Sequence, residues 1–315
     1  WSSDSICETN KIARSVNDNH QFYCLDLTHT PFVTIDGRDA RDYDDAIHAR
    51  KTDGGWLLEV AIADVSHYVR SGTPLDRAAR SRGNSTYFVD RVIPMLPEVI
   101  SNDLCSLLPG EDRLVIVCRI SIDYSGDIVG WTFSQALIRS RFRLTYDEVD
   151  RYLEERKQRF HLTWGEGVCE SLVVAEQIAL SRRNYRGRTG RLDISVPETE
   201  IKLGENGRVV AINYRERNTA VRLVEESMLS ANLCAARTLE NSLDAALYRV
   251  HQAPSLQDVV GLRQVLQRFG FTLPGGSSPR IQDFNQILNV TREALGRGQW
   301  LEGLVLRALK QARYD

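Results

Sequence analysis

Several marks of common protein classes are missing from this 315-residue sequence. No apolar run is long enough to cross a bilayer, so the sequence predicts no membrane-spanning helix and no membrane partner. No charged-then-apolar leader follows Trp1, and we expect a trimmed fragment and not a secreted protein. The formal net charge is −2, so the chain lacks the excess of basic residues that attracts a whole protein to polyanions. Any nucleic-acid binding would therefore need a local basic channel.

The six cysteines are scattered along the chain and contain no CxxC pair. Most lie among apolar residues, as Cys118 does at the end of the run that starts at Leu114. We expect reduced core thiols and a cytoplasmic protein. With 42% hydrophobic and 26% charged residues, the chain has enough material for one large mixed domain or for two domains.

The most distinctive stretch runs from Thr34 to Ile47, where five aspartates fall within ten positions: Asp36, Asp39, Asp42, Asp44 and Asp45. Apolar residues flank it on both sides and predict strand ends, which would seat the acidic loop on a core. Carboxylates held close together repel, so at neutral pH they take up protons or bind a cation. An all-oxygen set suits a hard ion, Mg²⁺ or Mn²⁺.

The spacing of four of these aspartates (Asp36, Asp42, Asp44 and Asp45) fits neither one helix nor one strand, and only a curled loop could bring them together. In such a loop Asp44 and Asp45 point to different sides, so that one could bind metal while the other orients water or a second ion. Two alternatives stay open from the spacing alone. The stretch could be a solvated acidic turn or a structural Ca²⁺ loop, although it lacks the spacing of an EF-hand.

The remaining patterns predict a largely antiparallel sheet with helices packed around it. Strand patterns, several of them paired across Gly-containing turns, occupy residues 47–50, 56–65, 113–123, 128–140, 198–203, 209–214 and 245–251. Helical patterns occupy residues 75–82, 145–155, 168–183 and 218–239, and three more follow residue 256. Thr145 and Glu148 form a capping-box pattern at the start of the second helix. Residues 1–30 are polar and weakly patterned, and we expect a linker from an upstream region.

The segment from Ala40 to Ala46, ARDYDDA, resembles the signature of the ribonuclease II and ribonuclease R family of exoribonucleases. Further segments are similar to landmarks of that family, in the same order: residues 60–69, 93–97, 104–107, 223–226, 231–232 and 248–251. The resemblance implies an α+β fold of the RNB type, with a mixed, antiparallel-rich sheet wrapped by helices. It places the catalytic domain at residues 31–315 and implies that the C-terminal part of that domain is missing.

What the resemblance implies about activity is specific. The family hydrolyses single-stranded RNA from the 3′ end with Mg²⁺, processively, and releases 5′-nucleoside monophosphates. By similarity Asp36, Asp42 and Asp45 are metal ligands, and Asp44 is the residue most closely tied to the chemical step. The implied partner is single-stranded RNA, with no obligate protein partner, and we expect a monomer.

Four residues outside the aspartates are candidates for RNA contact. By similarity Tyr87 packs against the terminal nucleotide, Tyr146 contacts RNA, and Glu225 lies near the RNA path, where it could accept from a 2′-hydroxyl. Arg188 lies in the most basic stretch, residues 182–191, and could contact phosphate. Each has an ordinary structural alternative: a buried tyrosine, a salt-bridged glutamate or a solvated basic face.

The chain departs from the family in two places. Ile194 stands where the family often has a phenylalanine that sandwiches the bases, which predicts a weaker 3′ clamp and longer final fragments. The family's downstream arginine motif and its C-terminal OB-fold are absent from the 315 residues. Because an arginine on a phosphoryl group contributes strongly to rate, we expect weak activity or none. The competing hypothesis is a catalytically silent RNA-binding or regulatory protein of the same fold.

Overall fold

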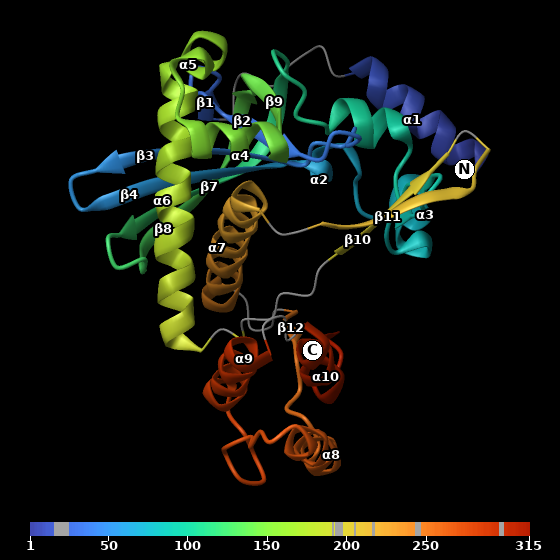
Figure 1. Ribbon diagram of the computed structural model, residues 1–315. Coiled ribbons are helices and arrows are strands. Elements are labelled where there is room, and N and C mark those ends of the chain that lie inside the picture. The colour runs from blue at the N-terminus through green and yellow to red at the C-terminus, as the bar shows by residue number, and fades with distance from the viewer. Residues whose placement is uncertain are drawn as a thin grey trace. The chain divides into compact units, whose positions relative to one another are not determined.

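The computed structural model describes residues 1–15, 25–190, 192, 198–204, 206–215, 218–242, 247–295 and 299–315. These residues form two compact units. Unit 1 comprises Trp1–Arg182, Glu200–Asn213 and Asn218–Cys234, and unit 2 comprises Arg183–Thr199, Tyr214–Arg217 and Ala235–Asp315. Figure 1 labels the elements in chain order. In the part of the chain that the structure describes, no helix has the length and apolarity needed to cross a membrane.

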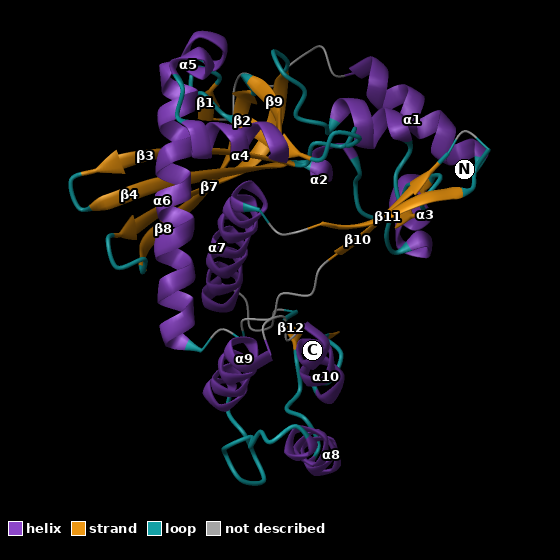
Figure 2. Ribbon diagram, in the orientation of Figure 1, coloured by secondary structure: helices purple, strands orange, loops and turns teal. Residues whose placement is uncertain are grey.

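Unit 1 is built on a seven-stranded sheet in the order β1-β8-β7-β4-β3-β2-β9. The strands, which Figure 2 shows in orange, are β1 (Leu25–Leu27), β2 (Val33–Asp36), β3 (Asp45–Thr52), β4 (Gly55–Ala63), β7 (Asp112–Asp123), β8 (Ile128–Arg139) and β9 (Phe142–Thr145). The four inner pairings, from β2–β3 to β7–β8, are antiparallel, while β1–β8 and β2–β9 are parallel. The expected mixed, antiparallel-rich sheet and its two hairpins are confirmed.

Apolar side chains on both faces of the sheet form two separate cores. Consecutive strand residues point to opposite faces, so Val60 of β4 enters one core and its neighbour Ala61 enters the other. The first core packs against α4 (Tyr146–Glu155), α6 (Glu166–Thr189) and the first half of α7 (Thr219–Ser242). The second core includes Tyr68 of α2 (Val65–Tyr68) and Ile100 of the π-helical segment Val99–Leu104. Burial on both faces explains why β4 is apolar along its length apart from Glu59, whose buried carboxylate pairs with His48 and Arg119.

The N-terminal residues expected to form a linker contain regular structure. Helix α1 (Ser3–Ser15) lies against α3 (Pro74–Arg82), and β1 pairs with β8. The Glu8 carboxylate accepts a hydrogen bond from the Leu75 N–H at the start of α3, with an N···O distance of 2.9 Å. The α1 side chains buried in this contact include the polar Ser5 and Thr9, so the helix has only a weak apolar pattern to reveal it.

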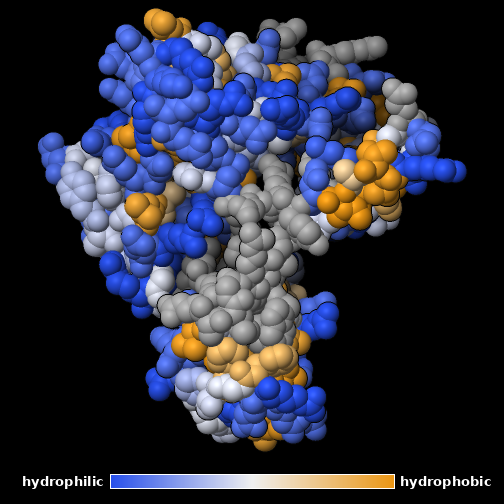
Figure 3. All heavy atoms as spheres, in the orientation of Figure 1, coloured by the Kyte–Doolittle hydropathy of each residue, from blue (hydrophilic) through white to orange (hydrophobic). Residues whose placement is uncertain are grey.

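Two short hairpins and one short helix lie outside the main sheet. β5 (Thr86–Tyr87) and β6 (Val92–Ile93) form a two-stranded antiparallel hairpin. β10 (Glu198–Leu203) and β11 (Val209–Arg215) form the expected two-stranded sheet. An apolar group is visible over it in Figure 3, where Val209, Val210 and Ile212 are exposed.

The expected helices at 75–82, 145–155, 168–183 and 218–239 are present, while α5 (Gln158–Trp164) had no predicted counterpart.

Unit 2 contains the three helices expected beyond residue 256: α8 (Leu256–Arg268), α9 (Ile281–Leu295) and α10 (Gln299–Ala308). Their apolar faces form a third core, which includes Leu266, Phe284 and Val305. β12 (Arg249–Val250) pairs antiparallel with β13 (Arg313–Tyr314). The expected strand at 245–251 is therefore present only as β12, and residues 243–246 lie outside the described part of the chain.

Candidate functional site

The acidic loop connects two strands that are neighbours in the main sheet. Strand β2 ends at Asp36 and β3 begins at Asp45, and the two strands pair at Val33 and Ile47. Asp36 stands opposite Thr145 of β9, and Asp45 stands opposite Ile62 of β4. Asp36 ends one strand and Asp45 begins its antiparallel neighbour, so both residues lie at the same end of the strand pair. The two ends of the acidic loop are therefore close together.

Tyr43 anchors the middle of the loop. Its side chain is buried, and its hydroxyl donates to the Ala40 carbonyl, with an O···O distance of 2.7 Å. Its backbone N–H donates to the Ser106 hydroxyl at 3.0 Å, and its carbonyl accepts from the Leu107 N–H at 2.8 Å. With Tyr43 directed inward, Asp42 remains half-buried and Asp44 exposed on either side of it.

Electrostatic coupling ties four of the aspartates together, and we call Asp36, Asp42, Asp44 and Asp45 the acidic cluster. Burial raises the pKa of the Asp36 carboxyl to about 7, and the charges of the other three members add to the shift. Burial and then the charge of Asp44 raise the pKa of Asp45 to about 6. Desolvation by neighbouring atoms, then the charge of Asp42, also raises the pKa of Asp44, although that residue keeps contact with solvent. Asp39 is exposed and contributes to none of these shifts.

The acidic cluster fits a hard divalent cation by charge and by donor type, since its side chains offer only carboxylate oxygens. Burial is the main cause of the raised pKa values of Asp36 and Asp45, and the neighbouring carboxylate charges add to both shifts. Across the described residues, however, no group of three or more His, Cys, Asp or Glu side chains is arranged so that it could hold a metal ion. Metal binding would therefore require these carboxylates to move closer together. A cation between them would favour this movement, because its charge would compensate theirs.

Arg143 of β9 also holds the acidic loop, a role that no sequence pattern predicted. Its guanidinium donates to the carbonyls of Gly37, at 3.4 Å, and Arg38. It also lies over the Tyr43 ring, with Cζ 5.2 Å from the ring centroid, and its charge opposes the upward pKa shift of Asp36. The contact depends on the parallel pairing of β9 with β2, which joins segments more than 100 residues apart in sequence.

Tyr87 reaches the acidic cluster from the β5–β6 hairpin. Its hydroxyl donates to a carboxylate oxygen of Asp42, with an O···O distance of 3.2 Å. The residue is 67% exposed, and its neighbour Phe88 is 49% exposed. The structure therefore brings one candidate RNA-contact residue next to the acidic cluster, with an aromatic surface open to solvent.

The other candidates lie in different parts of the fold. Tyr146 is the first residue of α4, directly after the Thr145 that pairs with Asp36, and it packs half-buried against the first core. Glu225 is half-buried on α7, next to the buried Glu226. Arg188 is exposed in the last turn of α6, in unit 2. Ile194 lies outside the described residues.

A helix-covered, antiparallel-rich sheet with a carboxylate cluster at the end of one strand pair defines the class of protein: an α+β domain built around an acidic centre. The family model of the RNB domain matches residues 25–315, and the chain belongs to that family. The match begins within the first 30 residues, at the start of β1. The resemblance noted in the sequence is thereby confirmed.

Several proteins named Ribonuclease R are similar in sequence. The protein from Escherichia coli (strain K12) is 40% identical over 296 residues, which cover 92% of this chain and 36% of the relative. The protein from Thermotoga maritima is 35% identical over 311 residues, which cover 98% of this chain and 43% of the relative. The chain thus spans less than half the length of these relatives.

Solved structures show the same fold. Mycoplasma genitalium RNase R in complex with ribose methylated single-stranded RNA superimposes with a TM-score of 0.91 at 32% identity, covering 100% of this chain and 49% of that one. The complex of the same enzyme with double-stranded RNA gives 0.90, covering 98% of this chain and 55% of that one. Yeast Ssd1, described as a pseudonuclease, gives 0.71 at 19% identity over 93% of this chain and 35% of that one. That last likeness concerns the fold alone.

Proposed function

We propose that the protein is an exoribonuclease that hydrolyses single-stranded RNA from its 3′ end, processively, with Mg²⁺ or Mn²⁺, and releases 5′-nucleoside monophosphates. The observation that carries the proposal is the convergence of the four aspartates of the acidic cluster in a chain of the RNB family. Similar proteins are named Ribonuclease R, and the solved structure of one of them holds single-stranded RNA. We further propose a cytoplasmic monomer without an obligate protein partner, with residues 31–315 as its catalytic domain.

In this proposal the aspartates of the acidic cluster have two different roles. Asp36, Asp42 and Asp45 hold the cation, and Asp44, the most exposed member, accepts a hydrogen bond from the attacking water and orients it. Divalent ions bound there would act as Lewis acids on the scissile phosphate and lower the pKa of a bound water. A half-buried cluster favours this chemistry, because the low local dielectric strengthens attraction between carboxylate and cation.

The remaining candidates position RNA. The exposed Tyr87 ring stacks on the terminal base, which contributes about 1–3 kcal/mol without regard to base identity. Tyr146 makes a second aromatic contact, and Glu225 accepts a hydrogen bond from a 2′-hydroxyl, which selects RNA over DNA. Arg188 pairs with backbone phosphate. The net charge of −2 supports local contacts of this kind over general attraction to polyanions.

The direct test is incubation of a 5′-labelled single-stranded RNA with the protein in Mg²⁺, in EDTA, and with Asp44→Asn. Asp39→Asn is the matched control, since Asp39 belongs to the same loop but not to the acidic cluster. We expect slow stepwise shortening in Mg²⁺, loss of shortening in EDTA and in Asp44→Asn, and the same rate as wild type in Asp39→Asn. A 3′-phosphorylated substrate tests polarity, excess unlabelled RNA tests processivity, and mass spectrometry identifies the mononucleotides.

The second candidate function is RNA binding without cleavage. It is favoured by the absence, among the described residues, of a preformed group of metal-ligating side chains. The fold by itself does not decide between the two, because a protein described as a pseudonuclease shares it. RNA that stays bound at full length in Mg²⁺ and in Mn²⁺, with wild type and Asp44→Asn alike, would establish this second function and overturn the first.

A further inference from the structure

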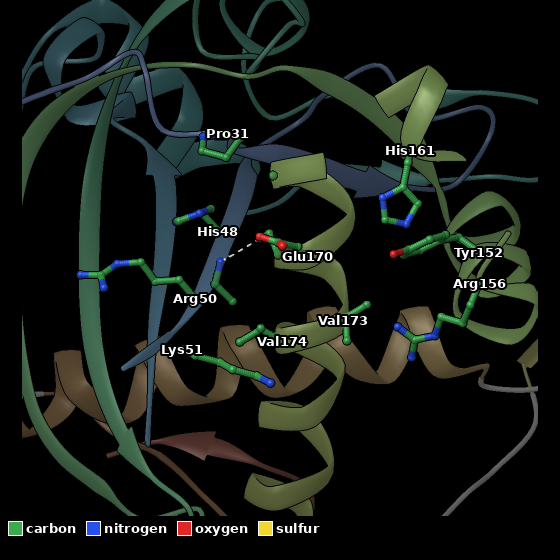
Figure 4. Close-up of a pocket in the computed structure, with 13 residues that line it drawn as sticks. Pro31, His48, Arg50, Lys51, Tyr152, Arg156, His161, Glu170, Val173 and Val174 are labelled. Atoms are coloured by element: carbon green, nitrogen blue, oxygen red, sulfur yellow. Dashed lines mark hydrogen bonds between the residues drawn. The ribbon is translucent and has the colours of Figure 1, made fainter. Parts of the chain in front are cut away.

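A pocket of about 600 Å³ lies in unit 1 at the far end of strand β3 from the acidic loop (Figure 4). Its walls come from β3, from α4 and α5, and from α6, with Pro31 at one side. Asp45 begins β3, and at about 3.3 Å per residue Lys51 lies on the order of 20 Å further along the strand. The pocket is therefore separate from the acidic cluster, and its volume falls within the range of small-molecule sites.

The pocket exists because β3 loses its neighbour halfway along. β2 pairs with β3 only at Val33 and Ile47, so the edge of β3 beyond that point has no strand beside it. The Ser171 hydroxyl of α6 instead accepts from the Ala49 N–H, with an N···O distance of 2.9 Å, drawn as the dashed line in Figure 4. Ala49, Val173 and Val174 supply an apolar floor. Helix and strand thus frame a preformed opening.

Nitrogen-bearing side chains from three elements surround this floor. In Figure 4, Arg156 of α4's C-terminus and His161 of α5 enter from one side, Lys51 of β3 enters from the other, and Arg50 extends away. Within the described residues, no carboxylate lies within ion-pair distance of the Lys51 ammonium. Glu170 is the acidic residue of the lining, and the Arg156 guanidinium is paired with Glu176. Lys51 therefore offers an uncompensated positive charge at an apolar opening.

The backbone at Arg156 supports a ligand-related role for this wall. Arg156 is the C-cap of α4 with φ of 50°, and among the described residues it is the one non-glycine with positive φ. Glycine is the usual residue at such a cap, because a side chain is strained there. The arginine side chain is fixed nonetheless: Nε donates to the Leu153 carbonyl at 2.9 Å, and Cζ lies 5.7 Å from the centroid of the Tyr152 ring. A strained residue that holds a cation at a pocket wall is a reason to look for a ligand.

We propose that this pocket binds a phosphate monoester with an aromatic body, of the size of a nucleoside monophosphate. The phosphate lies toward the uncompensated Lys51, and the base lies on the apolar floor toward Arg156 and His161. Phosphate matches Lys51 because its anionic oxygens accept charge-assisted hydrogen bonds from an ammonium group. The site does not use the acidic cluster, so the proposal stands independently of the proposed nuclease activity.

The test is calorimetric titration of the whole chain with AMP in EDTA, which removes divalent cations from the acidic cluster. Lys51→Ala is compared with Arg50→Ala, a matched control because both residues are exposed on the same strand and Arg50 extends away from the pocket. We expect AMP to bind, Lys51→Ala to weaken binding by about tenfold, and Arg50→Ala to change it by less than about twofold. Thermal melting checks that both variants fold.

Three further ligands separate the parts of the proposal. Adenosine lacks the phosphate, ribose 5-phosphate lacks the base, and inorganic phosphate lacks the base and the ribose; each is expected to bind more weakly than AMP. Equal affinity for inorganic phosphate and AMP would overturn the aromatic part of the proposal. No heat of binding with AMP up to millimolar concentration, or equal losses in Lys51→Ala and Arg50→Ala, would overturn the site itself.

Discussion

The Tyr87 hydroxyl donates a hydrogen bond to the Asp42 carboxylate at 3.2 Å, which links the β5–β6 hairpin to the acidic loop. The same tyrosine exposes most of its ring to solvent. Tyr87 thus combines a hydrogen bond to a proposed metal ligand with an aromatic surface for the proposed stacking of an RNA base. The two functions can be separated by removing the hydroxyl or the whole ring.

Tyr87→Phe should leave RNA affinity within about twofold of wild type, because the stacking surface remains, whereas Tyr87→Ala should lose about 1–3 kcal/mol of binding free energy. Fluorescence anisotropy with a labelled single-stranded RNA, in an Asp44→Asn background that prevents cleavage, measures both. Phe88→Ala, on the same hairpin and also exposed, is the matched control and should have a smaller effect. Equal losses in Phe88→Ala and Tyr87→Ala would contradict a specific role for Tyr87.

The free energy of unfolding of the metal-free protein should fall as pH rises from roughly 4 to 7. Burial and neighbouring charge raise the folded-state pKa of Asp36 to about 7 and that of Asp45 to about 6, from a value of 3.8. In this window the folded state holds protons that the unfolded state has released, so each rise in pH favours unfolding. Mg²⁺ should restore stability at pH 7.5 more than at pH 5. Urea denaturation in EDTA across this range measures the slope.

Asp36→Asn should remove much of that pH slope, because the residue with the highest pKa in the acidic cluster no longer titrates. Asp39→Asn should keep the slope, since Asp39 contributes to none of the shifts. A slope that is the same in wild type and both variants would show that the acidic cluster does not control stability in this range.

Arg143→Ala should raise the Mg²⁺ concentration needed for half-maximal activity and lower activity by about tenfold or more, since misplacing a reactive centre is costly. RNA affinity should change little, because Arg143 contacts loop backbone. Arg143→Lys should be intermediate, as lysine keeps the charge but not the planar fork. Loss of the positive charge should also extend the pH slope of stability upward, because the guanidinium opposes the Asp36 shift. Arg141→Ala, which loses contacts to the Thr28 and His29 carbonyls instead, is the control and should leave the Mg²⁺ requirement unchanged.

Gly126→Ala should destabilise the protein by about 1–3 kcal/mol. Gly126 has φ of 89° in the β7–β8 turn, and an added Cβ would lie 2.4 Å from the Ser181 carbonyl oxygen of α6. A side chain at this position is therefore disfavoured both by the backbone conformation and by the lack of space. Gly130→Ala, in β8 and with no atom within 4 Å of an added Cβ, should be nearly neutral in the same denaturation experiment.

Features encoded by local sequence were predictable. The hairpin of β3 and β4 follows from apolar strands around a Gly-containing turn, and Thr145 and Glu148 form the capping box that their spacing indicated. The electrostatic coupling among Asp36, Asp42, Asp44 and Asp45 was also predictable, because these residues lie within one short loop. What could not be predicted depends on pairing between distant segments. The parallel β2–β9 pairing places Arg143 at the loop, and the docking of α1 depends on polar contacts with little periodic signal.

The burial of Tyr43 has a consequence for how this loop can change over evolutionary time. Its ring points into the core, while Asp42 and Asp44 remain outside the core. Which side chains face inward therefore depends on the number of residues in the loop. Inserting or deleting one residue between Ala40 and Tyr43 would exchange the two orientations and force a carboxylate into the apolar interior. We therefore expect variation in the identity of exposed loop residues to be tolerated far better than variation in the length of the loop.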